Sequence, residues 1–138
     1  MDIVVPIDES DPAMQAVEHA VSEYPDARVT VIHVINPNIG MYGDGAVYAY
    51  DSILEARQSA ADALFESVGE LADEYDRSIE TETVVGLPAR EIVQFADEGS
   101  YDLIVMGSHG RSGASRVLLG SVAEQVVRRA PVPVTVVR

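Results

Sequence analysis

Cysteine and lysine are both absent from this sequence of 138 residues, and each absence excludes a class of chemistry. A chain without cysteine has no disulfide bond, no thiolate nucleophile and no cysteine-ligated metal. A chain without lysine cannot carry a Walker A loop, which ends in Gly-Lys-[Ser/Thr], and the dinucleotide signature G-x-G-x-x-G does not occur either. A nucleophile elbow is also missing. The sequence therefore contains no motif that supplies a catalytic residue or a protein-ligated metal.

Long hydrophobic runs are missing as well. No apolar run approaches the ~18 residues that a membrane-spanning helix needs, and the chain opens on a strand-like segment without the basic flank of a secretory signal. We therefore expect a cytoplasmic protein without membrane insertion. The length of 138 residues and a hydrophobic content of 47% suit one globular domain, over residues 1–138.

Positive charge is scarce, because nine arginines stand against 23 acidic residues and leave a net charge of −14. Binding to the phosphates of DNA or RNA requires clustered positive charge, so we expect no nucleic-acid partner. An acid-rich composition without lysine resembles that of proteins from halophilic cells, where dense salt screens the repulsion between like charges.

The charge is unevenly distributed along the chain. Residues 1–98 hold 21 acids and 4 arginines, whereas residues 99–138 hold 2 acids and 5 arginines, a local balance of +3. An anionic ligand would be attracted to this last part of the protein. The same asymmetry would also arise if the C-terminal third were simply buried and short of acids, and charge alone does not decide between the two.

Hydrophobic periodicity predicts strands and helices that alternate along the chain. Ser10 followed by Pro12 predicts the start of the first helix, and Ser121 with Glu124 fits a capping box for the last one. Residues 36–50, rich in glycine and tyrosine, are predicted to form a long loop. The predicted strands are 2–7, 28–35, 81–85, 103–106 and 134–137. The predicted helices start near 11, 51, 88 and 121 and end near 24, 77, 96 and 129.

Strands that alternate with helices predict an α/β fold with a parallel sheet and helices on both faces. In such sheets ligands bind beyond the carboxyl ends of the strands, where the strand order reverses. Asp8 follows the first strand, Val34 lies at the end of the second, and Gly107 follows the fourth. We therefore expect these three residues to meet at one edge of the sheet.

The segment from Gly107 to Ser121 is rich in glycine and polar residues. Glycines allow backbone N–H groups to approach a phosphate closely, and Gly120-Ser121 leads into a helix N-terminus, which favours an anion. Ser121 has two possible roles, since its hydroxyl can cap the helix or meet a phosphate. The whole segment could also be only a turn.

Two of the three histidines fall near this predicted edge. We interpret His33 as a strand-end or core histidine whose hydrogen bonds are satisfied. His109 lies within the glycine-rich segment, where a role beside a ligand and exposure on a turn are both open.

The spacing G-x-x-G-x(9)-G-[ST] of residues 107–121 resembles the nucleotide loop of the universal stress protein family, in its ATP-binding subgroup. Other stretches resemble the same family over nearly the whole chain. They are VVPIDES at 4–10, VIHVINP at 31–37, VGLPAREIVQFA at 85–96 and PVPVTVVR at 131–138.

The resemblance implies a three-layer α/β/α sandwich around a five-stranded parallel sheet of Rossmann-like, doubly wound topology. It also implies a site for ATP, with Mg²⁺ or Mn²⁺ bound through the phosphates. By position, Asp8 would contact the ribose region, the Val34 backbone would meet adenine, and Gly120 would line the phosphates. The binding residues implied in this way are Pro6, Ile7, Asp8, Ser10, Val34, Met106, Gly107, His109, Gly110, Arg111, Gly120, Ser121 and Val122.

The function implied by the resemblance is that of a nucleotide-binding regulatory protein of the stress response. It would signal to a downstream protein through its bound state. The resemblance also implies a homodimer that pairs its final strands, through Val134, Thr135, Val136 and Val137.

Two alternatives stay open, a slow ATPase and a dimeric interaction module that binds no nucleotide. Related ATP pyrophosphatases carry S-G-G-x-D-S after their first strand, whereas residues 7–10 read Ile-Asp-Glu-Ser. Because the sequence also offers no strong candidate base for a water molecule, we do not expect efficient turnover.

Overall fold

Strands and helices alternate strictly along the chain. A computed structural model describes residues 1–8, 10–37, 46–108 and 119–138, with the backbone alone for 46–50. The strands are β1 (Asp2–Pro6), β2 (Arg28–Ile35), β3 (Glu80–Val85), β4 (Leu103–Gly107) and β5 (Val134–Val137). The helices are α1 (Asp11–Glu23), α2 (Ala46–Glu74), α3 (Pro88–Glu98) and α4 (Ser121–Arg129).

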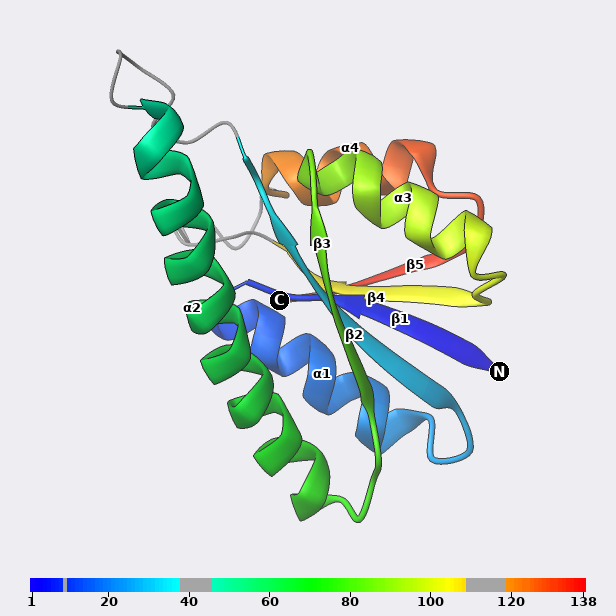
Figure 1. Ribbon diagram of the computed structural model, residues 1–138. Coiled ribbons are helices and arrows are strands. Elements are labelled where there is room, and N and C mark those ends of the chain that lie inside the picture. The colour runs from blue at the N-terminus through cyan, green and yellow to red at the C-terminus, as the bar shows by residue number, and fades with distance from the viewer. Residues whose placement is uncertain (9, 38–45, 109–118) are drawn as a thin grey trace.

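The strands form one parallel sheet in the order β3-β2-β1-β4-β5. Helices α1 and α2 cover one face of the sheet, and α3 and α4 cover the other (Figure 1). The predicted three-layer α/β/α architecture with a five-stranded parallel sheet is therefore confirmed. The strand order reverses between β1 and β4, because the chain first builds the sheet outward from β1 to β3 and then returns to the other side of β1.

The core is divided between the two faces by the alternation of side chains along each strand. In β1, Ile3 and Val5 pack against α1 and α2, whereas Val4 packs against α3 and α4, and all three are fully buried. Burying one such side chain stabilises the fold by roughly 1.5–3 kcal/mol. This two-sided burial explains why the central strands read as continuous apolar runs.

The start of α1 is as predicted. The Oγ of Ser10 accepts a hydrogen bond from the Ala13 N–H at 3.3 Å, and Pro12 lies in the first turn. A serine cap of this kind satisfies one of the N–H groups that an α-helix leaves unpaired at its N-terminus.

The predicted capping box of α4 is wrong. Gly120 is the N-cap residue and has no side chain that could cap this helix, and Ser121 is its first helical residue. The reason lies one residue upstream, where the Gly120 N–H donates to the Ser108 carbonyl at 2.7 Å. This bond holds Gly120 in an extended conformation and leaves Ser121 inside the helix.

Helix α2 begins at Ala46, five residues before its predicted start at Asp51. The predicted loop over 36–50 is therefore wrong for residues 46–50, which contain no glycine and two alanines, the strongest helix former. The part of that loop over 38–45 lies outside the described residues.

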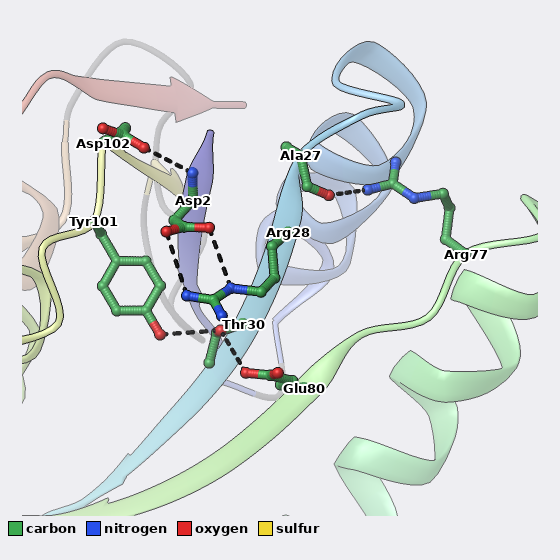
Figure 2. A network of polar contacts seen from close by, with 8 residues as sticks. All are labelled: Asp2, Ala27, Arg28, Thr30, Arg77, Glu80, Tyr101 and Asp102. Carbon is green, nitrogen blue, oxygen red and sulfur yellow. Dashed lines mark hydrogen bonds and ion pairs between the residues drawn. The ribbon is translucent and has the colours of Figure 1, made fainter.

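A network of paired polar groups lies at the amino edge of the sheet (Figure 2). The Arg28 guanidinium contacts the Asp2 carboxylate through Nε at 3.1 Å and Nη2 at 3.3 Å. The Asp2 N–H donates to Asp102 at 2.8 Å, and the Tyr101 hydroxyl donates to Thr30 Oγ1 at 3.0 Å. These bonds connect the starts of β1 and β2 with the residues that precede β4.

Arg77, just after α2, ties the end of α1 to the rest of the protein. Its guanidinium donates to the carbonyls of Val21 at 2.7 Å and Tyr24 at 2.9 Å, and also to the carbonyl of Ala27 (Figure 2 shows the Ala27 bond). A cation at a helix C-terminus satisfies otherwise unpaired carbonyl groups and interacts favourably with the helix dipole.

Candidate functional site

A cavity of about 310 Å³ opens at the carboxyl edge of the sheet, where the strand order reverses between β1 and β4. Its volume lies in the range of small-molecule sites. Strand ends β1, β2 and β4 and the first turns of α1, α3 and α4 supply its walls. The lining residues are Pro6, Ile7, Asp8, Ser10, Ala13, His33, Val34, Pro88, Ile92, Met106, Gly107, Gly120, Ser121, Val122 and Ala123.

One wall of the cavity is polar. The Asp8 carboxylate accepts a hydrogen bond from the Ser10 N–H through Oδ1 at 2.8 Å, so the turn between β1 and α1 holds this carboxylate in place. His33, near the end of β2, lies with its Nδ1 2.9 Å from the Ile7 carbonyl. Two side chains that can accept hydrogen bonds thus stand at the ends of neighbouring strands.

The opposite wall is apolar. Val34 of β2, Ile92 of α3, Met106 of β4 and Val122 of α4 all belong to the cluster that fills the α3 and α4 face of the sheet. Pro88, the first residue of α3, also lines the cavity. A surface of this kind suits a flat apolar ring better than a charged group.

The N-terminus of α4 closes the third side of the cavity. Gly120, Ser121, Val122 and Ala123 line it, and the N-cap residue Gly120 has no side chain to cap the helix. The first N–H groups of a helix have no partner within the helix, and the helix dipole places partial positive charge there. This end of the cavity therefore favours an anion such as a phosphate group.

Gly107 is required for a reason that the sequence did not reveal. A Cβ at this position would lie 2.8 Å from the backbone carbon of Pro12 and 3.0 Å from the nitrogen of Ala13. The end of β4 thus packs directly on the first turn of α1. The glycine serves the fold here, whether or not a ligand also approaches it.

Ten of the thirteen residues that the sequence implicated line this one cavity: Pro6, Ile7, Asp8, Ser10, Val34, Met106, Gly107, Gly120, Ser121 and Val122. The other three, His109, Gly110 and Arg111, lie outside the described residues. Our interpretation of His33 as a hydrogen-bonded strand-end histidine is consistent with its bond to Ile7, but the sequence did not implicate it in the site.

The sequence also missed Ala13, Pro88, Ile92 and Ala123, which line the cavity as well. The sequence offered only one signal for these residues, which is their position along the chain. Each of them lies in the first two turns of a helix that follows a strand. In the part of the chain that the structure describes, no group of three or more His, Cys, Asp or Glu side chains could hold a metal ion. None of its helices is long and apolar enough to cross a membrane.

These features define an α/β protein with a doubly wound parallel sheet and an anion-favouring cavity at the point where the strand order reverses. The family model of universal stress proteins matches residues 1–138, and the chain belongs to the universal stress protein family. A universal stress protein of Methanocaldococcus jannaschii is 40% identical over an alignment that covers 99% of this chain and 81% of that protein. One of Bacillus subtilis is 32% identical, with coverage of 99% and 97%.

Solved structures agree with this assignment. The universal stress protein UspA of Lactobacillus plantarum superposes with a TM-score of 0.86 at 30% identity, covering 100% of this chain and 97% of that one. A universal stress protein in complex with cAMP gives 0.75 at 26% identity, covering 100% and 97%. One from Archaeoglobus fulgidus in complex with dAMP gives 0.69 at 28% identity, covering 100% and 98%.

Proposed function

We propose that this protein binds an adenine nucleotide, ATP in its signalling state, in the cavity between β1 and β4. The observation that carries the proposal is the combination of an apolar wall, a polar wall and a helix N-terminus with glycine as its N-cap residue around one cavity. Similar folds that hold cAMP and dAMP support adenine as the base. We propose that the protein acts in the cytoplasm as a stress-response regulator and passes its bound state to a downstream protein.

In the proposed complex each wall takes one part of the nucleotide. Adenine lies along the apolar wall beside Val34 and Ile92, the ribose faces Asp8, and the phosphates meet the N–H groups of Ser121 and Val122. His109, Gly110 and Arg111 complete the phosphate site, as the family resemblance implies. A Mg²⁺ or Mn²⁺ ion, held mainly by the phosphates, would neutralise part of their charge.

Slow hydrolysis of ATP is a second candidate activity, and we do not propose efficient turnover. Among the lining residues that the structure describes, Asp8 is the one carboxylate, and its Oδ1 is engaged by the Ser10 N–H. A general base must lie within hydrogen-bond reach of the attacking water. We therefore expect the bound nucleotide to persist long enough to act as a signal.

The first test is to identify what the protein carries. The protein is purified in high salt and denatured, and the released small molecules are identified by mass spectrometry. We expect ATP or ADP in an amount close to one per chain. A protein that releases no nucleotide and also shows no heat with Mg-ATP in a calorimeter would be an interaction module instead.

Ser121→Asp tests the phosphate position directly. A carboxylate in the first turn of α4 complements the helix dipole and raises stability by about 0.3–1 kcal/mol. The same carboxylate repels phosphates, so we expect Mg-ATP to bind at least about tenfold more weakly. Stability and affinity would thus change in opposite directions.

Gln125→Glu is the matched control, because it adds one negative charge to an exposed position of the same helix outside the cavity lining. We expect this variant to bind Mg-ATP as the wild type does. If both variants weaken binding equally, net charge is responsible and the phosphates do not lie at Ser121.

We also propose a homodimer through β5, which is the last strand on its side of the sheet. The Pro133 carbonyl accepts from the Ile104 N–H and the Val137 carbonyl accepts from the Ser108 N–H, so alternate residues of β5 face β4. The N–H groups of Val134 and Val136 therefore point away from β4, where a second copy could pair.

Val136→Pro tests this dimer, because it removes one outward N–H and leaves the bonds to β4 intact. We expect light scattering to give twice the chain mass of 14.8 kDa for the wild type and the single mass for the variant. A wild type that is monomeric at all concentrations would contradict the proposal.

The net charge of −14 supports adaptation to high salt. Charges repel one another less when the Debye length falls from about 10 Å at 0.1 M to about 3 Å at 1 M salt. We expect the melting temperature to rise steadily with KCl between these concentrations. A melting temperature that does not change with KCl would show that the acidic surface carries no such adaptation.

A further inference from the structure

His33 has a defined tautomer. Its Nδ1 lies 2.9 Å from the carbonyl oxygen of Ile7. A carbonyl oxygen only accepts hydrogen bonds, so Nδ1 must carry the proton and donate it. In the neutral ring Nε2 then has a lone pair and can only accept. The backbone of β1 thus fixes both the orientation of the imidazole and the chemical character of its free nitrogen.

The location of His33 separates it from the apolar wall. Side chains alternate along β2, with Val31 on the face covered by α1 and Ile32 on the face covered by α3 and α4. His33 therefore lies on the α1 side, and Val34 lies on the opposite side. Both residues line the cavity, so the polar wall and the apolar wall meet at the end of β2.

The polar wall has unused capacity to accept hydrogen bonds. Within the described residues no group bonds the Nε2 of His33 or the Oδ2 of Asp8, although both side chains line the cavity. Ile7, whose carbonyl holds His33, directly precedes Asp8 in the chain. Two acceptors therefore lie at the carboxyl ends of the neighbouring strands β1 and β2 and line the same cavity.

Two acceptors that line one wall of the cavity match a ligand with two neighbouring donors. The 2′- and 3′-hydroxyl groups of a ribose are such a pair, on adjacent carbon atoms. The phosphate groups of a nucleotide offer no donors when ionised. Adenine has donors only on a single amino group, and its flat ring suits the apolar wall. The sugar is thus the part of the ligand whose chemistry fits the polar wall.

We infer that His33 is a specificity-determining residue that recognises the ribose, with Nε2 accepting a hydrogen bond from one of its hydroxyl groups. This inference rests on the proposed function, since it names the contact that selects the sugar in the same site. A site built to bond a hydroxyl group rejects a ligand that lacks it, because the acceptor is then left unpaired.

The ligand side of the test needs no variant. Calorimetry on the wild-type protein compares Mg-ATP with its 2′-deoxy and 3′-deoxy analogues. We expect at least one analogue to bind about five- to tenfold more weakly, which is the cost of one lost hydrogen bond. Equal affinities for all three ligands overturn the inference.

The protein side uses His33→Asn. The asparagine amide N–H₂ takes the approximate place of Nδ1 and can still donate to Ile7, whereas the acceptor at Nε2 is lost. We expect this variant to bind Mg-ATP about five- to tenfold more weakly and to lose the discrimination against the deoxy analogue. His19→Asn, on α1 and outside the cavity lining, is the control and should change neither affinity nor discrimination.

The outcomes distinguish a failure of the inference about His33 from a failure of the proposed function. A His33→Asn protein that loses affinity for all three ligands by one factor shows that His33 only supports the fold of the site, which overturns the inference and leaves nucleotide binding intact. A wild type that binds no adenine nucleotide overturns the proposed function and the inference with it.

Imidazole ¹⁵N spectra of the wild type decide the question if the variant does not fold. The chain has three histidines, so the signals can be assigned by substituting the other two. We expect the Nε2 resonance of His33 to shift when Mg-ATP binds and to shift less with the rejected analogue. Identical shifts with both ligands overturn the inference.

Discussion

The two edges of the sheet are built from similar polar residues and use them differently. At the amino edge the polar side chains bond one another, as Asp2 does with Arg28 and Tyr101 does with Thr30 (Figure 2). At the carboxyl edge Asp8 and His33 each bond a backbone group, and each keeps an acceptor that no group among the described residues bonds. The amino edge pairs polar side chains with one another, whereas the carboxyl edge keeps acceptors with which a ligand can bond.

Residues that stabilise the fold and residues that can bind a ligand therefore lie at different edges of the sheet. A polar group that is already paired contributes to the fold, whereas an unpaired group beside a cavity can contribute to recognition. Substitutions at the amino edge should therefore change the free energy of unfolding and leave nucleotide affinity unchanged. Substitutions at the carboxyl edge should show which of its residues also contribute to the free energy of unfolding.

The largest effect on stability is expected for Arg77→Met. The change removes donors from three carbonyls near the end of α1 and removes a cation from the helix C-terminus. We expect the free energy of unfolding to fall by about 3 kcal/mol in urea titrations. Affinity for Mg-ATP should stay within about twofold of wild type once the variant is folded.

Arg90→Met is the control for Arg77→Met, because Arg90 is exposed on α3. A loss of less than about 0.5 kcal/mol is expected there. If the two variants lose the same stability, the bonds between Arg77 and the α1 carbonyls do not matter for the fold.

Gly107→Ala should lower the stability of the protein although Gly107 lies at the carboxyl edge, because this residue lines the cavity and also packs against α1. The new Cβ would contact the backbone of Pro12 and Ala13. We expect a loss of about 2 kcal/mol in the free energy of unfolding, because backbone atoms cannot move aside easily.

Gly69→Ala is the matched control, because a Cβ there has no atom within 4 Å and lies within α2. This change should stabilise the protein by about 0.5–1 kcal/mol. The two glycine substitutions thus have opposite expected signs, and a stabilising Gly107→Ala would contradict the close approach of β4 to α1.

Tyr101→Phe should have a smaller effect at the amino edge. The change removes one hydrogen bond to Thr30, which is buried, but keeps the stacking of the ring on Phe95 at 5.5 Å between centroids. We expect a loss of about 1 kcal/mol by thermal unfolding and no change in affinity for Mg-ATP. Weaker binding by this variant would show that the two edges are coupled.

Tyr75 gives the smallest expected effect and one that depends on pH. Its hydroxyl donates to Glu18 at 2.7 Å, and this bond, with desolvation and the charges of Glu18 and Glu74, raises the pKa of the phenol. A raised pKa means that the contribution to stability is complete below the usual value of 10.0 and disappears as the pH rises through the higher folded value.

Tyr75→Phe should therefore lower the melting temperature slightly at pH 8, and the difference from wild type should vanish in strongly alkaline buffer. Melting curves across this range measure it. A difference that does not change with pH would show that the bond to Glu18 contributes nothing.

The sequence predicted best those elements whose signals are local. The runs of β-branched residues gave β2 and β5 with their observed ends, and Ser10 marked the start of α1. The start of α2 was wrong because glycine and tyrosine up to residue 45 hid the helical residues that follow. The cap of α4 was wrong because a bond between Gly120 and Ser108 decides it, and that bond is not local.

Residues of the candidate site were predicted only where the family pattern covers them. His33, Pro88 and Ile92 were missed because only the strand order brings them to the cavity. The structural role of Gly107 was missed for the same reason, because its neighbour in space, Pro12, lies far from it in the sequence. Contacts between distant segments have no signature in a single sequence.

The strand order also has a consequence for biosynthesis. The cavity draws on Pro6 at one extreme of the sequence and on Ala123 at the other, because the chain completes one half of the sheet before it returns to β1. A ribosome must synthesise the chain beyond Ala123 before this cavity exists. Capture of a nucleotide would then mark a chain in which both halves of the sheet have been made, and a product interrupted before Ala123 would bind none.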